Sequence, residues 1–221
     1  MIMKVLELFA GTRSIGKAFE QYGHEVYSIE WDKQFENIDL YADIMTVTAD
    51  QILEAFGHPD VIWASPDCTT FSVAAISHHR RKNKETGSLD PISAYAKFCD
   101  AVDQHVLDLI RELKPTYWFI ENPRGGMRKM SWMRDLPRYT VTYCQYEMHK
   151  PVSERRMKPT DIWTNHPDPK FKPPCKNGDP CHAAAPRGSA TGTQGIKGAK
   201  FRSVIPEELC EHIVEICEGA E

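Results

Sequence analysis

Short apolar runs alternate with amphipathic helical patterns over residues 1–165. The runs have the length and flanking residues of buried strands, and the segments between them repeat apolar residues at spacings of three and four. The expected strands are residues 4–11, 24–32, 60–67, 116–125, 139–148 and 160–165, and the expected helices are residues 13–23, 92–115 and 205–219. This alternation predicts an α/β fold with a doubly wound, mostly parallel, Rossmann-like sheet.

The pattern changes at residue 166, where Pro, Gly, Lys and small residues replace the periodic segments. We therefore expect a main α/β domain over residues 1–165 and a small loop-rich appendage over residues 166–202. Residues 203–221 should contain a C-terminal helix that packs back on the main domain. Loops of this length are usually functional or mobile.

The composition is typical of a soluble globular protein, with 41% hydrophobic and 26% charged residues in a chain of 221. No apolar run approaches the ~18 residues that a membrane span needs, so we expect no membrane contact. Seven scattered cysteines suggest reduced thiols and a cytoplasmic protein. The net charge of −4 means that any contact with nucleic acid must come from local basic patches.

Polar side chains follow the expected strands, at the edge where ligands bind in a parallel sheet. In "LFAGTRSIG" a glycine-bearing turn opens a helix and offers free backbone N–H groups, although a plain strand-to-helix turn has the same look. Glu30 can accept from both hydroxyls of a ribose, or it is a solvated strand end. Asp43 is placed to accept from an adenine amino group.

Cys68 lies in "VIWASPDCTTFS", directly after an apolar run. Such a cysteine is a buried core thiol, a metal ligand or a nucleophile. Pro66 ends the run and Cys68 falls in a polar turn, which favours the nucleophile. Glu121 follows another apolar run, where a carboxylate is costly unless it has a partner.

Two further groups of residues have less specific patterns. Arg80, Arg81, Lys82 and Lys84 form a basic loop close behind Cys68, and this loop either closes on a phosphate backbone or is simply solvated. Cys175, Cys181 and His182 are candidate zinc ligands, but their spacing is unlike the usual pairs and no fourth ligand is evident. The sequence therefore does not predict a metal site.

The order of these pieces resembles that of DNA (cytosine-5) methyltransferases. The similar segments are "LELFAGTRSIGKAF", "SIEWD", "ADI", "SPDCTTFS", "ENPRGG" and "FRSVIPEELCEHIVEI". The resemblance covers most of residues 1–165 and the last twenty or so, and it is closest to small phage-type members. It implies the fold of the class I S-adenosylmethionine-dependent methyltransferases, and a cytoplasmic location in the host cell if the protein is phage-encoded.

The resemblance also implies roles for particular residues. S-adenosyl-L-methionine is expected to be bound by Phe9, Ala10, Gly11, Thr12, Ser14, Gly16, Glu30, Trp31, Asp43, Ile44 and Pro66. The catalytic candidates are Cys68, Glu121, Arg155 and Arg156. Contacts with double-stranded DNA are expected from Ser72, Arg80, Arg81, Lys82, Lys84 and Arg124.

The implied reaction is methyl transfer to carbon 5 of cytosine through a covalent adduct. The Cys68 thiolate would add to carbon 6 of a cytosine flipped out of the duplex, and Glu121 would contact N3. Arg155 or Arg156 would fill the basic role of the family's Gln-x-Arg-x-Arg motif.

The chain also departs from the family pattern. It has Asp67-Cys68-Thr69 where Pro-Cys-Gln is usual, and only the loop-rich region stands where a target-recognition domain is normally inserted. We therefore expect short or relaxed recognition, unless a partner protein supplies the rest. An RNA cytosine-5 methyltransferase and a non-catalytic nucleic-acid-binding protein on the same fold remain alternatives.

Overall fold

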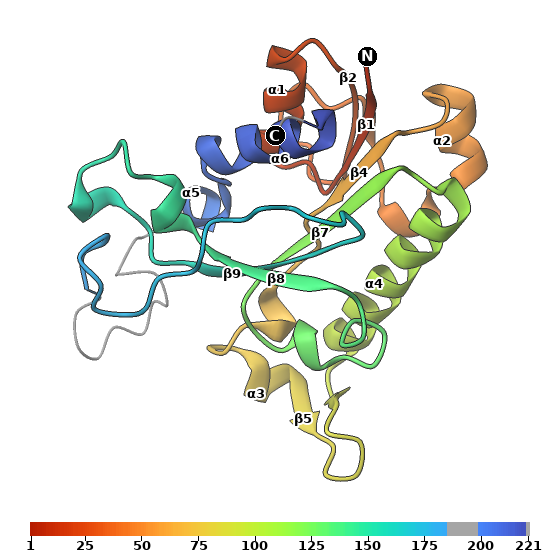
Figure 1. Ribbon diagram of the computed structural model, residues 1–221. Helices are drawn as coiled ribbons and strands as arrows, with labels where there is room; N and C mark the ends of the chain where they lie inside the picture. Colours follow the sequence, from red (N-terminus) through yellow and green to blue (C-terminus); the bar gives the residue numbers. More distant parts are fainter. Residues whose placement is uncertain (185–198, 220–221) are drawn as a thin grey trace.

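A seven-stranded sheet forms the centre of the computed structural model, which describes residues 1–184 and 199–219 (Figure 1). The strand order is β3-β2-β1-β4-β7-β9-β8. The strands are β1 (Lys4–Leu8), β2 (Glu25–Glu30), β3 (Leu40–Tyr41), β4 (Val61–Ala64), β7 (Tyr117–Pro123), β8 (Arg138–Thr142) and β9 (Pro159–Thr164). The neighbours from β3 to β7 pair in parallel, whereas β9 is antiparallel to both β7 and β8.

Helices cover both faces of the sheet, so the predicted doubly wound α/β fold is confirmed. One face is covered by α1 (Ser14–Gln21) and α6 (Glu207–Glu218), whose apolar side chains pack with those of β1, β4 and β9. The other face is covered by α2 (Ala49–Ala55) and α4 (Ala94–Leu113). Two apolar cores therefore lie on either side of the sheet and fix the positions of its strand ends.

The helix expected over residues 92–115 is present, and its ends have clear causes. The Ser93 side chain accepts from the Ala96 N–H at the start of α4. The helix ends where Lys114 takes a left-handed conformation just before Pro115. The helix α2 was not predicted from the sequence; it is short, and a capping box between Thr48 and Gln51 fixes its start.

The basic loop behind Cys68 is a short antiparallel hairpin of β5 (Arg80–Lys82) and β6 (Leu89–Pro91). It follows α3 (Ile76–His79) and projects from the lower end of the molecule in Figure 1. Asn83 closes the turn, because its backbone N–H bonds the Ser88 carbonyl and its side chain accepts from Glu85 and Thr86.

Residues 165–184 run along the sheet edge at β8 without forming a helix or strand, and α5 (Ala199–Ser203) precedes α6. The intervening residues 185–198 of the predicted loop-rich region lie outside the described residues. The division of the chain at residue 165 stays a prediction. In the described ranges, no helix has the length and apolarity needed to cross a membrane.

Candidate active site

The loop between β1 and α1 turns sharply beside the end of the sheet. Phe9, Gly11 and Arg13 all have positive φ angles, of 57°, 50° and 57°. Such angles are uncommon for residues other than glycine, so the surrounding contacts must hold the loop in this shape. One of these contacts is the Gly11 N–H, which donates to Glu30 Oε2 at 2.9 Å.

Glu30 ends β2 as predicted, and its carboxylate is largely used by backbone groups. Besides the bond from Gly11, its Oε1 accepts from the N–H groups of Trp31 at 2.9 Å and Asp32 at 3.0 Å. An ionised carboxylate has about four acceptor positions, so roughly one is left for a ligand hydroxyl. Glu30 therefore both shapes the loop and keeps an oxygen for a ligand.

A pocket of about 350 Å³ opens beside this loop, at the carboxyl ends of β1 and β2. Of the predicted cofactor residues, those that line it are Phe9, Glu30, Trp31, Asp43 and Ile44. Trp31 is 72% exposed, an unusual position for an aromatic side chain unless it covers a ligand. The Asp43 side chain also accepts from the Met45 N–H at 3.0 Å, which fixes its orientation.

The other predicted cofactor residues do not line this pocket; they are Ala10, Gly11, Thr12, Ser14, Gly16 and Pro66. At Gly16 the absence of a side chain has a packing cause. A Cβ there would collide with Glu7 Oε2 and lie 3.1 Å from Val26. Pro66 is buried, and its carbonyl accepts from the Asn122 amide at 3.0 Å, so it holds the end of β4 in place.

The far wall of the pocket comes from α4, which the sequence analysis did not assign to the site. Tyr95, Phe98, Cys99, Val102 and Asp103 line it at helical spacing. Asp103 is 4% exposed, and its Oδ2 has no hydrogen-bond partner among the described residues. Burial raises the pKa of the Asp103 carboxyl well above its usual value. The sequence does hold a signal for Asp103, because an acidic residue interrupts the apolar face of the predicted helix.

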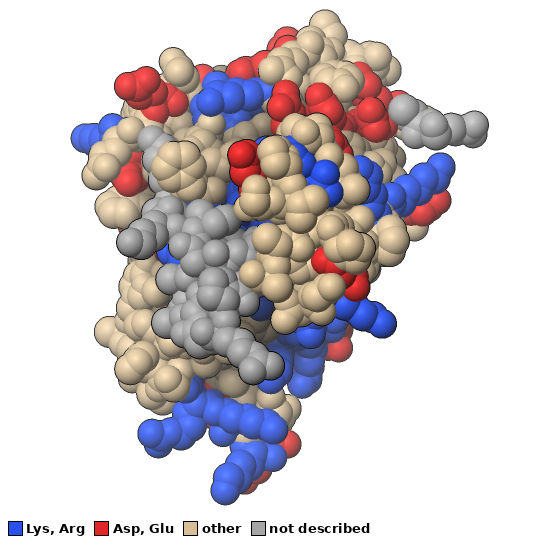
Figure 2. All heavy atoms as spheres, turned by 90° about the vertical axis from the view of Figure 1, so that its left-hand side faces the viewer, with Lys and Arg blue, Asp and Glu red and all other residues tan. Residues whose placement is uncertain are grey.

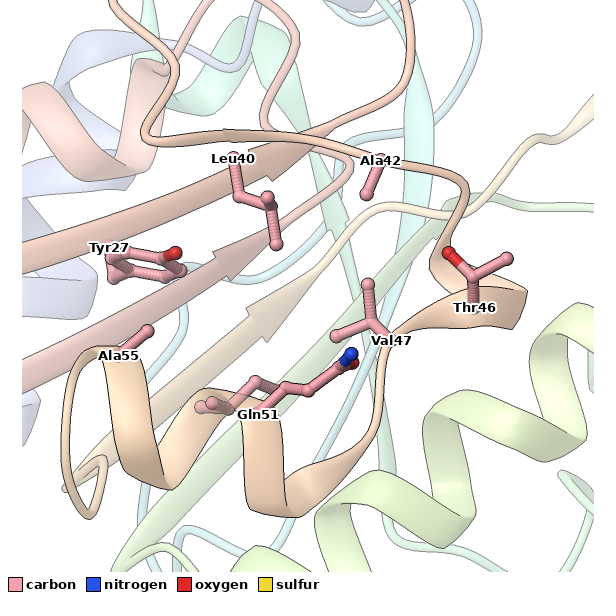
Figure 3. A pocket seen from close by; sticks show the side chains of 8 residues that line it. Tyr27, Leu40, Ala42, Thr46, Val47, Gln51 and Ala55 are labelled. Atoms are coloured by element: carbon pink, nitrogen blue, oxygen red, sulfur yellow. The ribbon is translucent and has the colours of Figure 1, made fainter.

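A second, smaller pocket of about 260 Å³ lies between α2 and two strands, β2 and the edge strand β3 (Figure 3). Most of the side chains that line it are apolar, and Gln51 and Thr46 are the more polar ones. No carboxylate, thiol or imidazole is part of its lining. It therefore offers no group for acid–base or nucleophilic chemistry, unlike the pocket at the strand ends.

Cys68 follows β4 and begins a tight turn, η2 (Thr69–Phe71). Its carbonyl accepts from the N–H groups of Phe71 at 3.1 Å and Ser72 at 2.9 Å, so the turn is closed around it. The thiol is half-buried and free. Burial raises the pKa of the Cys68 thiol, as do the charges of Asp67 and Glu121, whereas the charge of Lys158 lowers it.

Glu121 lies next to this turn because β7 pairs in parallel with β4, with Ile120 opposite Ala64. Glu121 as a whole is 6% exposed, and the Tyr143 hydroxyl donates to its Oε1 at 3.3 Å. The structure therefore brings together Cys68 and Glu121, the two catalytic candidates from separate strand ends.

Lys158 completes this group and was missed in the sequence analysis. It directly precedes β9, and its Nζ lies 4.8 Å from the centre of the Tyr143 ring and donates to the Arg202 carbonyl at 2.9 Å. Burial lowers the pKa of Lys158, and the charges of Glu121 and Cys68 raise it. Its position as the last cation before a predicted strand was the available signal.

The expectation that Arg155 or Arg156 acts at the site is corrected. The Arg156 guanidinium binds Glu147 at 2.5 Å and 2.8 Å and the carbonyls of Phe201 and Val204 at 3.0 Å and 2.7 Å. Arg155 donates to the carbonyls of Lys150 and Met148 at 2.7 Å and 2.8 Å. Both guanidinium groups therefore bind other parts of the chain. The cation that lowers the pKa of Cys68 is Lys158.

The expectation that Arg80 binds phosphate is also corrected. Arg80 is 4% exposed, stacks 4.0 Å from the Phe71 ring and pairs with Asp100 at 2.6 Å. It also donates to the Thr70 hydroxyl at 2.9 Å, so it ties the hairpin to the turn that carries Cys68.

The remaining predicted DNA contacts are accessible. Arg81, Lys82, Lys84 and Arg124 are exposed, and Ser72 is half-buried. Figure 2 shows Lys and Arg side chains gathered at the lower end of the molecule, where the hairpin projects. The exposed basic side chains of the hairpin begin at Arg81, thirteen residues after Cys68 in the sequence.

The loop after β7 is pressed against the same turn. A Cβ on Gly125 would collide with the Phe71 carbonyl oxygen, and the Gly126 N–H donates to that oxygen at 2.8 Å. Only glycine permits this approach at residue 125. The "ENPRGG" segment thus supplies both Glu121 and the close contact that positions the Cys68 turn.

Comparisons with known proteins give a family match for most of the sheet domain and similar folds among solved structures. Residues 3–131 match the family model of C-5 cytosine-specific DNA methylases. The protein named "Probable DNA (cytosine-5)-methyltransferase" of Frog virus 3 (isolate Goorha) is 29% identical over 164 residues, which cover 74% of this chain and 71% of that protein.

Two solved structures share the fold. One is described as a "putative DNA modification methyltransferase" encoded within an E. coli prophage, with a TM-score of 0.52 and 16% identity over 73% of this chain and 46% of that one. The Entamoeba histolytica methyltransferase EhMeth has a TM-score of 0.50 and 13% identity over 74% of this chain and 53% of that one. The chain thus spans about half the length of these two structures.

Proposed function

The chain belongs to the family of C-5 cytosine-specific DNA methylases, and on this premise we propose that it methylates cytosine in double-stranded DNA through a covalent adduct on Cys68. Membership makes it a cytosine methyltransferase that uses S-adenosylmethionine. The observation that carries the finer proposal is the meeting of Cys68, Glu121 and Lys158 beside the pocket at the strand ends.

Cys68 lies between groups of opposite charge. The Asp67 and Glu121 carboxylates raise the pKa of the Cys68 thiol, and the charge of Lys158 lowers it. The reactive arrangement has the proton on Glu121 and the negative charge on Cys68. Burial disfavours the free thiolate, and Lys158 offsets part of that effect.

This arrangement suits attack on a cytosine ring. Cysteine sulfur forms a bond to carbon 6, and the electron pair of the carbon 5–carbon 6 double bond becomes available at carbon 5. A protonated Glu121 donates to N3 and so stabilises the negative charge that the ring gains. After methylation, loss of the proton from carbon 5 expels the Cys68 thiolate and restores the ring.

The pocket at the strand ends has the groups that S-adenosylmethionine requires. Its lining combines the aromatic rings of Phe9 and Trp31 with the carboxyl groups of Glu30, Asp43 and Asp103. The buried and unpartnered Asp103 Oδ2 fits a cationic ligand, and Glu30 keeps an acceptor position for a ribose hydroxyl. When bound, the cofactor supplies an electrophilic methyl group.

The exposed charges favour a nucleic acid as the substrate, and the matched family points to DNA. Arg81, Lys82, Lys84 and Arg124 are accessible near the Cys68 turn, and such side chains position a phosphate backbone without reading its sequence. In the described part of residues 165–206, the only helix or strand is the five-residue α5. Base-specific contacts need side chains on rigid elements, so recognition should be short or relaxed unless a partner protein contributes.

The proposal is tested by transfer of a tritiated methyl group to mixed-sequence DNA and to tRNA, followed by nucleoside analysis. We expect 5-methylcytosine in duplex DNA, none with Cys68→Ser, and a modified motif of a few base pairs by bisulfite sequencing. Label in tRNA alone would make the protein an RNA methyltransferase. Cofactor binding without transfer to either substrate would make it a non-catalytic binding protein.

A further inference from the structure

Four side chains with metal-binding atoms converge at the edge of the sheet near β8. Cys144 belongs to η4 (Tyr143–Tyr146), which directly follows β8, and Cys175, Cys181 and His182 come from the segment 165–184. One ligand atom from each of the four lies within 4.8 Å of all the others. Cys144 is the fourth ligand that the sequence pattern lacked.

The distances between these atoms suit a tetrahedral metal ion. Cys144 Sγ lies 3.1 Å from Cys175 Sγ and 3.9 Å from Cys181 Sγ. His182 Nδ1 lies 3.6 Å from Cys175 Sγ and 3.3 Å from Cys181 Sγ. With zinc–sulfur bonds of ~2.3 Å and zinc–nitrogen bonds of ~2.0 Å, a tetrahedron has sulfur–sulfur edges of about 3.8 Å and sulfur–nitrogen edges of about 3.5 Å.

Disulfide bonding does not account for the cluster. The shortest sulfur–sulfur distance, 3.1 Å, is far above the ~2.05 Å of a disulfide, and all seven cysteines are free. A disulfide would in any case use two of the three sulfurs and leave the third cysteine and His182 unused. A single metal ion with four coordination positions accounts for all four side chains of the cluster.

We propose that Cys144, Cys175, Cys181 and His182 bind one structural Zn²⁺ ion. Thiolate and imidazole ligands in a tetrahedral set select zinc over the hard cations, which prefer oxygen. Four protein ligands leave no open position for water or substrate, so the site holds the chain together and does no chemistry. Cys144 and His182 are buried and the other two are half-buried, which shields the ion from solvent.

The ion fastens a segment that has little other support. Residues 165–184 form no helix or strand, and near the cluster they are held by a few bonds, such as Cys175 N–H to the Thr142 hydroxyl at 3.0 Å and Ala183 N–H to the Val152 carbonyl at 3.2 Å. Zinc ligands from β8's end and from this segment close a loop of about thirty residues, which removes much of its conformational freedom.

The metal site also adjoins the catalytic group. Cys144 follows Tyr143, whose hydroxyl donates to Glu121 and whose ring contacts Lys158. Arg155, between the two parts of the cluster, donates to the Cys181 carbonyl at 3.4 Å. Loss of the ion should therefore loosen the segment 165–184 first and disturb Tyr143 second.

The test is metal analysis of the protein purified without chelators. We expect one zinc per chain, released by a thiol-blocking mercurial. The variants Cys181→Ser and His182→Gln should lose it, and the matched control Cys217→Ser, which removes a buried thiol in α6, should keep it. Cys181 is half-buried, so its replacement tests the ligand without the unfolding risk at the fully buried Cys144.

Cobalt substitution gives a second readout that needs no methyl transfer. The cobalt-loaded protein should show thiolate charge-transfer bands and the visible bands of a tetrahedral ion, and both should be weakened in Cys181→Ser. Chelation should make residues 165–184 sensitive to limited proteolysis while the sheet resists. Zinc content equal in wild type and Cys181→Ser, or a Cys144–Cys175 disulfide in the freshly purified protein, would overturn the proposal.

Discussion

The thiol of Cys68 and the cluster of Cys144, Cys175 and Cys181 lie in different surroundings, and on our proposals they have different chemistry. Cys68 faces acids, Asp67 and Glu121, and one cation, Lys158, so its proton is the exchangeable species. Cys144 faces two other sulfurs and an imidazole, the set that we propose binds a metal ion. If both proposals hold, the groups opposite a thiol, more than its burial, decide whether it acts as a nucleophile or as a ligand.

The two groups also differ in how the chain builds them. Cys68 and Glu121 follow adjacent parallel strands and meet because β4 and β7 pair in register. The sulfur cluster needs the end of β8 and a segment thirty residues later that has no regular structure. Changing one charged residue should therefore be enough to abolish the reactivity of Cys68. Loss of a ligand from the sulfur cluster should instead loosen the whole segment 165–184.

The largest expected effect comes from Glu121→Gln. Glutamine keeps the shape and one donor but cannot exchange a proton with Cys68 or N3. Methyl transfer in single turnover should fall by roughly 10²–10⁴, the usual contribution of general acid–base catalysis. Cofactor affinity measured by calorimetry should stay unchanged. A loss smaller than tenfold would remove Glu121 from the proton-sharing pair.

Lys158→Met should have the next largest effect, and the effect should depend on pH. Removing the cation takes away the charge that lowers the pKa of Cys68, so the thiolate forms only at higher pH. Adduct formation near pH 7 should fall roughly tenfold, and its pH profile should move to the alkaline side.

Two variants separate this electrostatic role from a loss of structure. Lys158→Arg should restore the wild-type pH profile because it keeps the charge. Lys17→Met, which removes an exposed lysine of α1, should leave the profile where it was. A uniform drop in rate at every pH would mean that Lys158 only packs against Tyr143.

The hairpin should affect DNA affinity without touching the chemistry. Replacing Arg81, Lys82 and Lys84 together by Gln should reduce the slope of affinity against salt by ~0.9 for each phosphate that the hairpin no longer neutralises. Methyl transfer at saturating DNA should be unchanged. Arg80→Gln is the matched comparison, because it should lower the melting temperature instead. An unaltered slope in the triple variant would make the hairpin a solvated surface only.

The smallest expected effect is that of Asp103→Asn on the cofactor. Loss of a carboxylate that faces a cation should weaken binding by about 1 kcal/mol, or roughly fivefold. Because burial raises the pKa of Asp103, binding of a cation should release a proton, and wild-type affinity should rise with pH. Calorimetry in buffers of different ionisation enthalpy measures that proton. Asp108→Asn, on the exposed face of α4, should behave as wild type.

The sequence was sufficient wherever the information is local. Each strand end is marked by a change from apolar to polar residues, and this change located Glu30, Cys68 and Glu121 before any contact was known. The parallel sheet then placed these ends on one edge. The predicted family is confirmed, because the motifs on which it rested are also short local segments of sequence.

The sequence was insufficient where the role of a residue depends on which distant residue it contacts or on which side of a strand it points. Arg80 and Arg81 are adjacent in a basic run, yet the alternation of a strand turns the first inward to Asp100 and the second to solvent. Lys158 reaches Cys68 only because β9 runs antiparallel to β7. Cys144 becomes a metal-ligand candidate only when residues 165–184 fold back on η4.

The central claim is that Cys68 forms the covalent adduct, and a duplex containing 5-fluorocytosine tests it most directly. Fluorine at carbon 5 cannot leave as a proton does, so with S-adenosylmethionine present the adduct should persist and its mass should include the protein, the DNA and one methyl group. The adduct should map to the peptide that contains Cys68, disappear in Cys68→Ser and remain in Cys217→Ser, which removes a buried thiol in α6 away from the cofactor pocket. A persistent adduct in Cys68→Ser, or none in a wild-type protein that methylates ordinary DNA, would contradict the account.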